Sequence, residues 1–370
     1  MRIACVLAAL AFPVLAHAQS APAIRGAGAT FPAEVYAAWG SGYARDKKVP
    51  LQYQAVGSGE GVKRITSRQV DFGASDEPMA AAELQKNNLL QFPTLVGGLV
   101  PVYNLRGVKP GELRLNGAVL AKIFAGRIKA WNDPELAALN RGLALPARPI
   151  HRVVREEASG STRTLVRYLA RHDASWEPRI ALKVDWAGEA QAVRGTKGMA
   201  EAVKATEGAI GYVSYQEVVR QSLSAAQLQN RSGAFVLAGE RSIQAAVAAS
   251  DLSRGDETAN LVDVAGPEAW PLTETTFVLL PKTVTDPAQA KRTLNFFYWV
   301  FAQGDQMASD TGFVALPTRI QARLLSRFRE ITGPDGRPIE FLGAQPWATE
   351  YAFNWFSSRP AATRSRPAGA

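Results

Sequence analysis

The chain has 370 residues, of which 47% are hydrophobic and 20% charged, and its formal net charge is +9. This length can bury two cores, and the composition is that of an ordinary globular protein. Cys5 is the only cysteine, so a mature chain that has lost its leader can form no disulfide and has no thiol nucleophile. Basic charge suits a nucleic acid, an anionic surface or a small anion. No Lys/Arg run is interleaved with aromatic residues, so we expect no nucleic-acid partner.

Residues 1–18 are typical of a secretory signal peptide. Arg2 precedes an apolar run that is too short for a membrane span, and Ala16-His17-Ala18 fits the small-x-small rule for cleavage before Gln19. Cys5 lies near the start of this run, whereas a lipoprotein cysteine would end it, so no lipid anchor is expected. The sequence therefore predicts export to the periplasm.

Strand-like and helical segments alternate along the rest of the chain. Strands are expected over residues 51–56, 71–75, 99–105, 150–154, 209–213 and 276–280. Helices are expected over residues 32–45, from about 61, and over 119–124, 165–170, 287–301 and 319–329. Asp286 is predicted to cap the helix that begins with Pro287. Such alternation favours an α/β fold.

Three segments share one local design, in which a turn rich in glycine or small residues carries a hydroxyl residue just before a helix. Unpaired N–H groups and the partial positive charge at a helix start favour a small oxyanion. Each segment taken alone is weak evidence for an anion site, because Ser or Thr before a helix is usually a plain N-cap. The residues concerned are Thr30 and Phe31 in GAGATFP, Ser58 in VGSGEG, and Ser159, Gly160 and Ser161 in ASGST.

Signals for catalysis are poor. VGSGEGVKR is no phosphate-binding Walker loop because no Ser or Thr follows Lys63, and Asp71-Phe72-Gly73 lacks the other kinase motifs. His151 and His172 have no metal-ligand spacing, and no G-x-S-x-G elbow occurs. We therefore expect no enzyme, no metal and no cofactor.

The C-terminal part is compositionally distinct. An aromatic cluster, which could pack onto the body or dock a partner, comprises Trp347, Tyr351, Phe353, Trp355 and Phe356. Residues 357–370, rich in Ser, Pro, Ala and Arg, are predicted to form a flexible basic tail.

The segments GAGATFPAEVYAAW, YQAVGSGEGVKRI, VDFGASDEPM and QFPTLVGGLV occur in an order and spacing that resemble the phosphate-binding proteins of Pst ABC transporters. The later segments IFAGRIKAWNDP, VVREEASGSTRTLVRYL, GAIGYVSY and AWPLTETTFVLLPK extend the resemblance from about residue 26 to about 338. It implies a type II periplasmic-binding-protein fold of two α/β lobes that close on phosphate. Lobe one would comprise residues 23–96 and 275–345, and lobe two residues 97–274. The resemblance further implies a monomer that delivers phosphate to the membrane permease subunits of an ABC importer.

The same resemblance assigns roles within the site. Phosphate would receive backbone N–H groups from Thr30, Phe31 and Ser58, the hydroxyls of Thr30 and Ser58, and donors from Ser159, Gly160 and Ser161 of the facing lobe. Arg155 would pair with the anion, and Asp76 would be the one acceptor.

Three residues depart from the family pattern. Glu157 stands where the family usually has an Asp that orients the arginine. Because Glu157 is one methylene longer, the family pattern does not fix how it contacts Arg155. Ala158 replaces a glycine and would strain the turn at positive φ. Glu60 lies in a loop that is usually small and uncharged.

An ionised Asp76 can only accept hydrogen bonds, so it would favour phosphate, which keeps a proton, over sulfate, which has none. Arsenate also keeps a proton and is not excluded. The alternatives are another tetrahedral oxyanion on the same fold, such as sulfate, arsenate or molybdate, a secreted phosphatase, or an adhesion protein.

Overall fold

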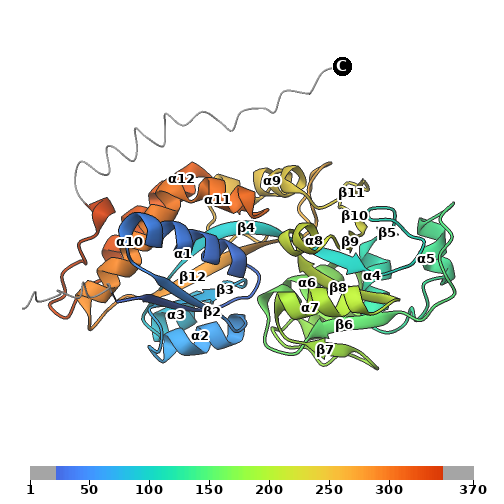
Figure 1. Cartoon of the computed structure of the whole chain (residues 1–370), viewed down its shortest axis with the longest axis horizontal. Coiled ribbons are helices and arrows are strands. Elements are labelled where there is room, and N and C mark those ends of the chain that lie inside the picture. The colour runs from blue at the N-terminus through green and yellow to red at the C-terminus, as the bar shows by residue number, and fades with distance from the viewer. Residues whose placement is uncertain (1–21, 345–370) are drawn as a thin grey trace, which may run out of the picture.

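The computed structural model describes residues 22–344, which form two α/β lobes joined by β4 (Leu89–Tyr103) and β12 (Thr273–Pro281) (Figure 1). The α/β class predicted from the alternating segments is confirmed. The signal peptide, the aromatic cluster at 347–356 and the tail 357–370 lie outside the described residues.

Lobe one is built from the two ends of the described chain. Its elements are β1 (Ile24–Gly28), α1 (Ala33–Lys47), β2 (Leu51–Ala55), α2 (Ser58–Thr66), β3 (Phe72–Ser75), α3 (Ala81–Lys86), α10 (Pro287–Gln303), α11 (Asp305–Asp310), β13 (Val314–Ala315) and α12 (Thr318–Arg327). Figure 1 shows α10 beside α1, although they are far apart in sequence.

Lobe two is formed by the intervening segment. Its elements are β5 (Arg114–Leu115), α4 (Gly117–Phe124), α5 (Pro134–Leu139), β6 (His151–Arg155), α6 (Gly160–His172), β7 (Gln191–Val193), α7 (Gly195–Ala205), β8 (Ala209–Ser214), α8 (Tyr215–Gln221), β9 (Ser224–Ala225), β10 (Gln227–Gln229) and β11 (Phe235–Val236). α9 (Glu240–Ala249) follows and packs against β4 and β13.

One sheet runs through both lobes in the order β2-β1-β3-β12-β4-β8-β6-β7. The pairs β1–β2, β1–β3, β6–β7 and β6–β8 are parallel, whereas β12 runs antiparallel to β3 and β4. The carboxyl ends of β1, β2 and β3 in lobe one, and of β6 in lobe two, lead into the segments that carry the predicted site residues. Open α/β sheets bind ligands at such strand ends.

β4 begins ten residues before the strand predicted at 99–105, and each of its residues is buried. A strand covered on both faces shows no alternation, so its pattern gives no period to detect. Pro93 and two glycines also mimic loop signals. Pro93 lies opposite Phe277, next to the register shift at Thr276/Phe277, where a missing N–H is tolerated.

Local capping explains where two helices begin. The Asp286 side chain accepts from the Gln289 N–H at 3.0 Å and Pro287 occupies the first helical turn, as predicted. Ser159 caps α6 through its hydroxyl, which accepts from the Thr162 N–H at 3.2 Å.

Aromatic side chains of α10 pack against the sheet of lobe one. The Phe297 ring lies edge-on to Phe72 of β3 and Phe92 of β4, with centroids 5.1 and 5.3 Å apart. All three rings are almost completely buried, so they hold α10 against strands from the N-terminal part of the chain.

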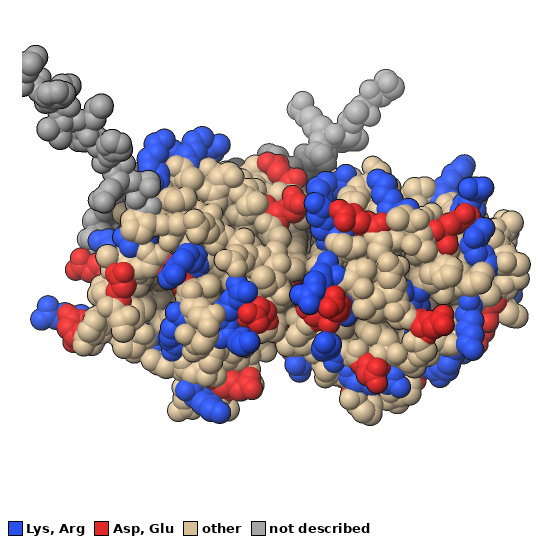
Figure 2. Space-filling model, turned by 60° about the horizontal axis from the view of Figure 1, so that its bottom comes forward, with Lys and Arg blue, Asp and Glu red and all other residues tan. Residues whose placement is uncertain are grey.

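Charged side chains of both signs are interspersed over the face shown in Figure 2, without one continuous basic region. Within residues 22–344, no helix is long and apolar enough to cross a membrane.

Candidate functional site

The sequence-predicted residues meet where the two lobes touch. The Ser58 hydroxyl, in the first turn of α2, accepts from the Asp76 N–H and from the Gly160 N–H, both at 3.2 Å. Asp76 follows β3 in lobe one, and Gly160 begins α6 in lobe two. Ser58, Asp76 and Gly160 are all buried. Two helix starts and the end of a strand therefore converge on one small region.

Arg155, the last residue of β6, reaches across to lobe one. Its Nη2 donates to Thr30 Oγ1 at 2.8 Å, and its Nε donates to Glu157 Oε1 at 2.8 Å. The Arg155 side chain is 3% exposed. A buried guanidinium with its direction fixed by a carboxylate and a hydroxyl is suited to an oxyanion.

Glu157 holds Arg155 despite being longer than the usual aspartate. Its Oε1 also accepts from the Gly195 N–H at 3.1 Å, at the start of α7. Burial alone would raise the pKa of Glu157, but the bond and charge of Arg155 and two backbone N–H groups together hold this pKa below its usual value. Glu157 is therefore a carboxylate that neutralises Arg155 within lobe two.

The other departures do not disturb the site. Ala158 is not among the residues of the described chain with positive φ, so the strain considered for this turn is absent. Its carbonyl accepts from the Gly59 N–H at 3.1 Å, which adds a backbone contact between the lobes. Glu60 points to the α2 surface, where it pairs with Arg64 at 2.8 Å.

Asp76 lies at the junction, directly after β3. Its Oδ1 accepts from Thr276 Oγ1 at 2.6 Å, and burial raises its pKa to about 7 against the opposing effects of Thr276 and Arg155. The carboxyl group is thus poised to share a proton near neutral pH.

The remaining predicted residues also have defined contacts. Ser159 caps α6, while the Ser161 hydroxyl donates to Glu274 Oε1 at 2.7 Å. The Phe31 ring is buried, edge-on to Phe313 at 5.2 Å. Thr30 and Phe31 precede α1, and Ser58 and Ser161 lie in the first turns of α2 and α6, where a backbone N–H has no acceptor within its own helix. Free N–H groups at helix starts can serve an anion.

Four residues at the junction were missed by sequence reasoning. Thr196 of α7 bonds Thr30 through its hydroxyl at 3.0 Å, and Thr276 bonds Asp76. Glu274 lies beside Ser161, and Glu77 of lobe one forms a forked ion pair with Arg167 of α6 at 2.7 and 3.0 Å. Each is an isolated residue whose partner is remote in sequence, so no local motif identifies it.

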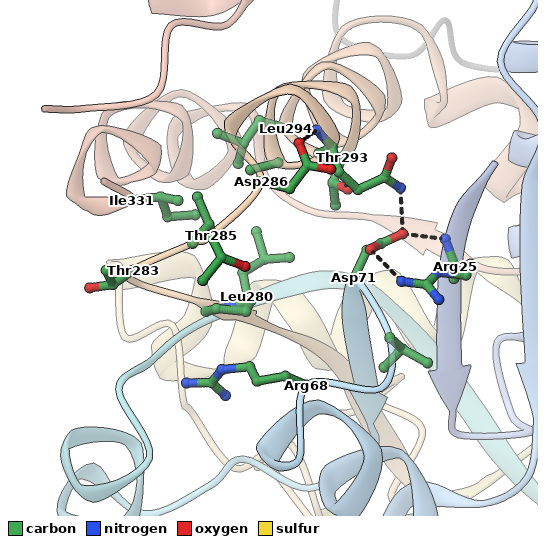
Figure 3. A pocket seen from close by; sticks show the side chains of 15 residues that line it. Arg25, Arg68, Asp71, Leu280, Thr283, Thr285, Asp286, Thr293, Leu294 and Ile331 are labelled. Carbon is green, nitrogen blue, oxygen red and sulfur yellow. Dashed lines mark hydrogen bonds and ion pairs between the residues drawn. The ribbon is translucent and has the colours of Figure 1, made fainter. Parts of the chain in front are cut away.

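A separate pocket of about 240 Å³ lies in lobe one, away from this junction (Figure 3). Its charged residues are already engaged: Asp71 accepts from the Arg25 backbone N–H at 2.7 Å and from Gln289 at 2.6 Å. Arg68 donates to two backbone carbonyls. None of the predicted site residues lines it, and we do not assign it a ligand.

No group of three or more potential metal-ligating side chains occurs among the residues described. His172 instead lies 3.7 Å from Asp263, and burial lowers its pKa. The candidate site is defined by the hydrogen-bond donors at the junction.

A sequence profile of the PBP superfamily domain matches residues 14–303. The phosphate-binding protein PstS of Haemophilus influenzae is 38% identical over 315 residues, covering 84% of this chain and 93% of that protein. PstS of Pasteurella multocida is 37% identical over 338 residues, covering 90% of this chain and 98% of that protein.

Among solved structures, a high-affinity periplasmic phosphate-binding protein, PfluDING, bound with phosphate, superposes with a TM-score of 0.68 at 22% identity. The match covers 83% of this chain and 94% of that one. At this identity the likeness concerns the fold, which is that of the type II periplasmic-binding proteins. Sequence and fold together show that the chain belongs to the PBP superfamily and, within it, to the family of PstS phosphate-binding proteins.

Proposed function

We propose that this protein binds inorganic phosphate between its lobes and delivers it to an ABC importer. The observation that carries the proposal is the junction of Ser58, Asp76, Arg155 and Gly160, which brings helix starts and a guanidinium from both lobes together. Relatives named phosphate-binding proteins align with this chain over most of its length.

The donors in our assignment come from both lobes. Lobe one supplies the N–H groups of Thr30, Phe31 and Ser58 and the hydroxyls of Thr30 and Ser58. Lobe two supplies Arg155 and the turn of Ser159, Gly160 and Ser161, with Glu157 supporting Arg155. Charge-assisted bonds of this kind are short and strong when water is excluded, which suits a dehydrated anion.

Asp76 provides selectivity in this proposal. Phosphate near neutral pH always carries a proton to give to the carboxylate or to share with it, whereas sulfate carries none. A sulfate oxygen facing Asp76 would place lone pairs against lone pairs in a buried site, and this arrangement is costly.

We also propose lobe boundaries at residues 96/97 and 274/275. Gly97 lies opposite Glu274 in the β4–β12 pair, so the two crossings lie side by side in the sheet. A Cβ on Gly97 would lie 2.7 Å from both Phe31 and Phe313, so only glycine fits where β4 passes between the lobes.

A receptor of this kind works outside the cytoplasmic membrane as a monomer without catalysis, so we assign it to the periplasm after signal cleavage. Membrane permease subunits would then receive phosphate from it. This assignment rests on the leader sequence and on the family.

Calorimetric titration of the purified mature protein with phosphate, arsenate and sulfate tests the proposal. We expect phosphate to bind with a Kd of about 1 μM or tighter, which corresponds to roughly 8 kcal/mol, and sulfate to bind at least a hundredfold more weakly. Equal affinity for phosphate and sulfate, or no heat with any of the anions, would contradict it.

A further inference from the structure

Glu274 is a further carboxyl group in the candidate site, beside Asp76 and Glu157. It lies in β12, is 3% exposed, and stands two residues from Thr276. Because side chains alternate along a strand, residues 274 and 276 share a face, and Thr276 on that face bonds Asp76. The Glu274 side chain therefore points to the same region as Asp76.

The Ser161 hydroxyl connects Glu274 to the predicted anion donors. Ser161 lies in the first turn of α6, and its Oγ lies 2.7 Å from Glu274 Oε1. Glu274 Oε2 is buried and has no hydrogen-bond partner among the described residues. A buried, half-satisfied carboxylate is costly, so this group requires either a proton or a further partner.

A hydroxyl has one proton to donate, and this fact gives the Ser161–Glu274 pair two arrangements. With Glu274 ionised, Ser161 donates to the carboxylate and presents only lone pairs elsewhere. With Glu274 protonated, the carboxyl O–H donates to Ser161 Oγ, which frees the Ser161 proton for an anion oxygen. The protonation state of Glu274 thus decides whether Ser161 can serve the anion.

The groups around Glu274 act on its pKa in both directions. Burial raises its pKa well above the usual value, and the Asp76 charge across the junction adds to this rise. The hydroxyls of Ser161 and Thr164 on α6 and the Arg155 guanidinium at the end of β6 act in the opposite direction. The facing residue on β4 is Gly97, which has no titratable group.

We infer that Glu274 is a positioning residue that takes up a proton when the anion binds, and thereby turns the Ser161 hydroxyl toward the anion. The inference rests on the proposed function. The proton comes from the buffer and ends on the Glu274 carboxyl group, and no covalent bond to the ligand changes. An anion at the junction would add a second negative charge beside that of Asp76, and both charges strengthen the hold of Glu274 on a proton.

The test measures the protons taken up per phosphate bound, by calorimetry in two buffers of different ionisation enthalpy at one pH. Glu274→Gln mimics the protonated acid, because its NH₂ group can donate to Ser161 Oγ permanently. We expect wild type to take up more protons than the variant, by up to about one per site. The titration of phosphate itself is common to both proteins and cancels in this difference.

The affinity profile gives a second readout. In the pH range where uptake occurs, the wild-type affinity should fall relative to that of Glu274→Gln by up to about tenfold per unit rise in pH. Glu83→Gln, which makes the same change on the exposed face of α3, should keep the wild-type uptake and profile.

If Glu274→Gln fails to fold, as seen by circular dichroism, infrared difference spectra of unmodified protein replace it. Phosphate should then produce a gain in the carbonyl band of protonated carboxyl groups, and no gain would overturn the inference. Equal proton uptake by wild type and a folded Glu274→Gln would also overturn it. Absence of phosphate binding by wild type would instead contradict the proposed function.

Discussion

The Gly160 N–H of lobe two donates to the Ser58 hydroxyl of lobe one at 3.2 Å. A Cβ at Gly160 would lie 2.9 Å from Ser58 Oγ and 2.7 Å from Asp76 Cβ. These distances are too short for ordinary contacts, so the lobes can meet here only because Gly160 has no side chain.

Gly160→Ala should therefore weaken phosphate binding by at least about tenfold, since the methyl group holds the lobes apart at the site. Overpacking at a tight contact typically costs about 1–3 kcal/mol. Gly198→Ala in α7 is the matched control, because its Cβ would meet only Val193 of β7, at 3.9 Å. Calorimetry and thermal melting of both variants measure the effect, and an unchanged Kd for Gly160→Ala would show that closure tolerates the methyl group.

Arg155→Ala should reduce phosphate affinity by about 2–5 kcal/mol, because a buried charge partner of the anion is removed. Arg155→Lys should also bind more weakly, since one ammonium cannot hold both Thr30 and Glu157 while facing an anion. Arg171→Ala, on the exposed part of α6, controls for the loss of one positive charge. If wild type, both Arg155 variants and Arg171→Ala give the same titration curve, Arg155 does not contact the anion.

Glu157→Gln should cost about 1–3 kcal/mol of phosphate affinity, because Arg155 loses a charged acceptor and one amide group cannot replace it. The neighbouring Glu156→Gln is a control, since Glu156 is half-exposed and pairs with Arg194 on the surface. We expect circular dichroism to show both variants folded. If both titrate alike with phosphate, Glu157 has no supporting role.

Asp76→Asn should change the ratio of phosphate to sulfate affinity rather than simply lower phosphate affinity. The amide replaces one acceptor oxygen with an NH₂ donor, so a fully ionised anion no longer meets a carboxylate. Sulfate binding should become measurable. The comparison uses both anions and both proteins at one pH and salt concentration, and a ratio that stays constant would show that Asp76 does not discriminate.

Ligand-free stability should depend on pH through Asp76. Its pKa is raised to about 7 in the folded protein, so the protonated form is favoured by folding. This contribution is fully present below the unfolded pKa near 4 and is lost as pH rises through about 7. Between these values the wild-type unfolding free energy should fall, relative to Asp76→Asn, by up to about 1.4 kcal/mol per pH unit. Parallel denaturant curves for the two proteins across this range would contradict the prediction.

The sequence predicted those features that depend on neighbouring residues. Asp286 before Pro287 identified the start of α10, because this cap acts within three residues. Ser159, predicted as an anion donor, also acts as the N-cap of α6, which is the usual role of a Ser before a helix. The motif resemblance supplied the candidate residues that the structure brings together at the junction.

Features that depend on distant residues could not be predicted in this way. Glu274 is one acid within a strand, and its partner Ser161 is 113 residues away. The first ten residues of β4 were missed because complete burial removes alternation. The Glu77–Arg167 ion pair connects the two lobes. From sequence alone both residues would be taken as exposed surface charges, and only the folded structure shows that Glu77 is mostly buried.

The insertion of lobe two between β4 and β12 has a consequence for the order of folding. The strands of lobe two follow one another within a single continuous stretch, so this lobe can form while the chain is still emerging. β3 must wait for β12, because Asp76 and its partner Thr276 are separated by 200 residues. Contacts so remote in sequence form slowly, since a long loop must close first. The anion site should thus be among the last parts of the molecule to mature, and a nascent chain that ends before β12 should have a folded second lobe but no capacity to hold phosphate.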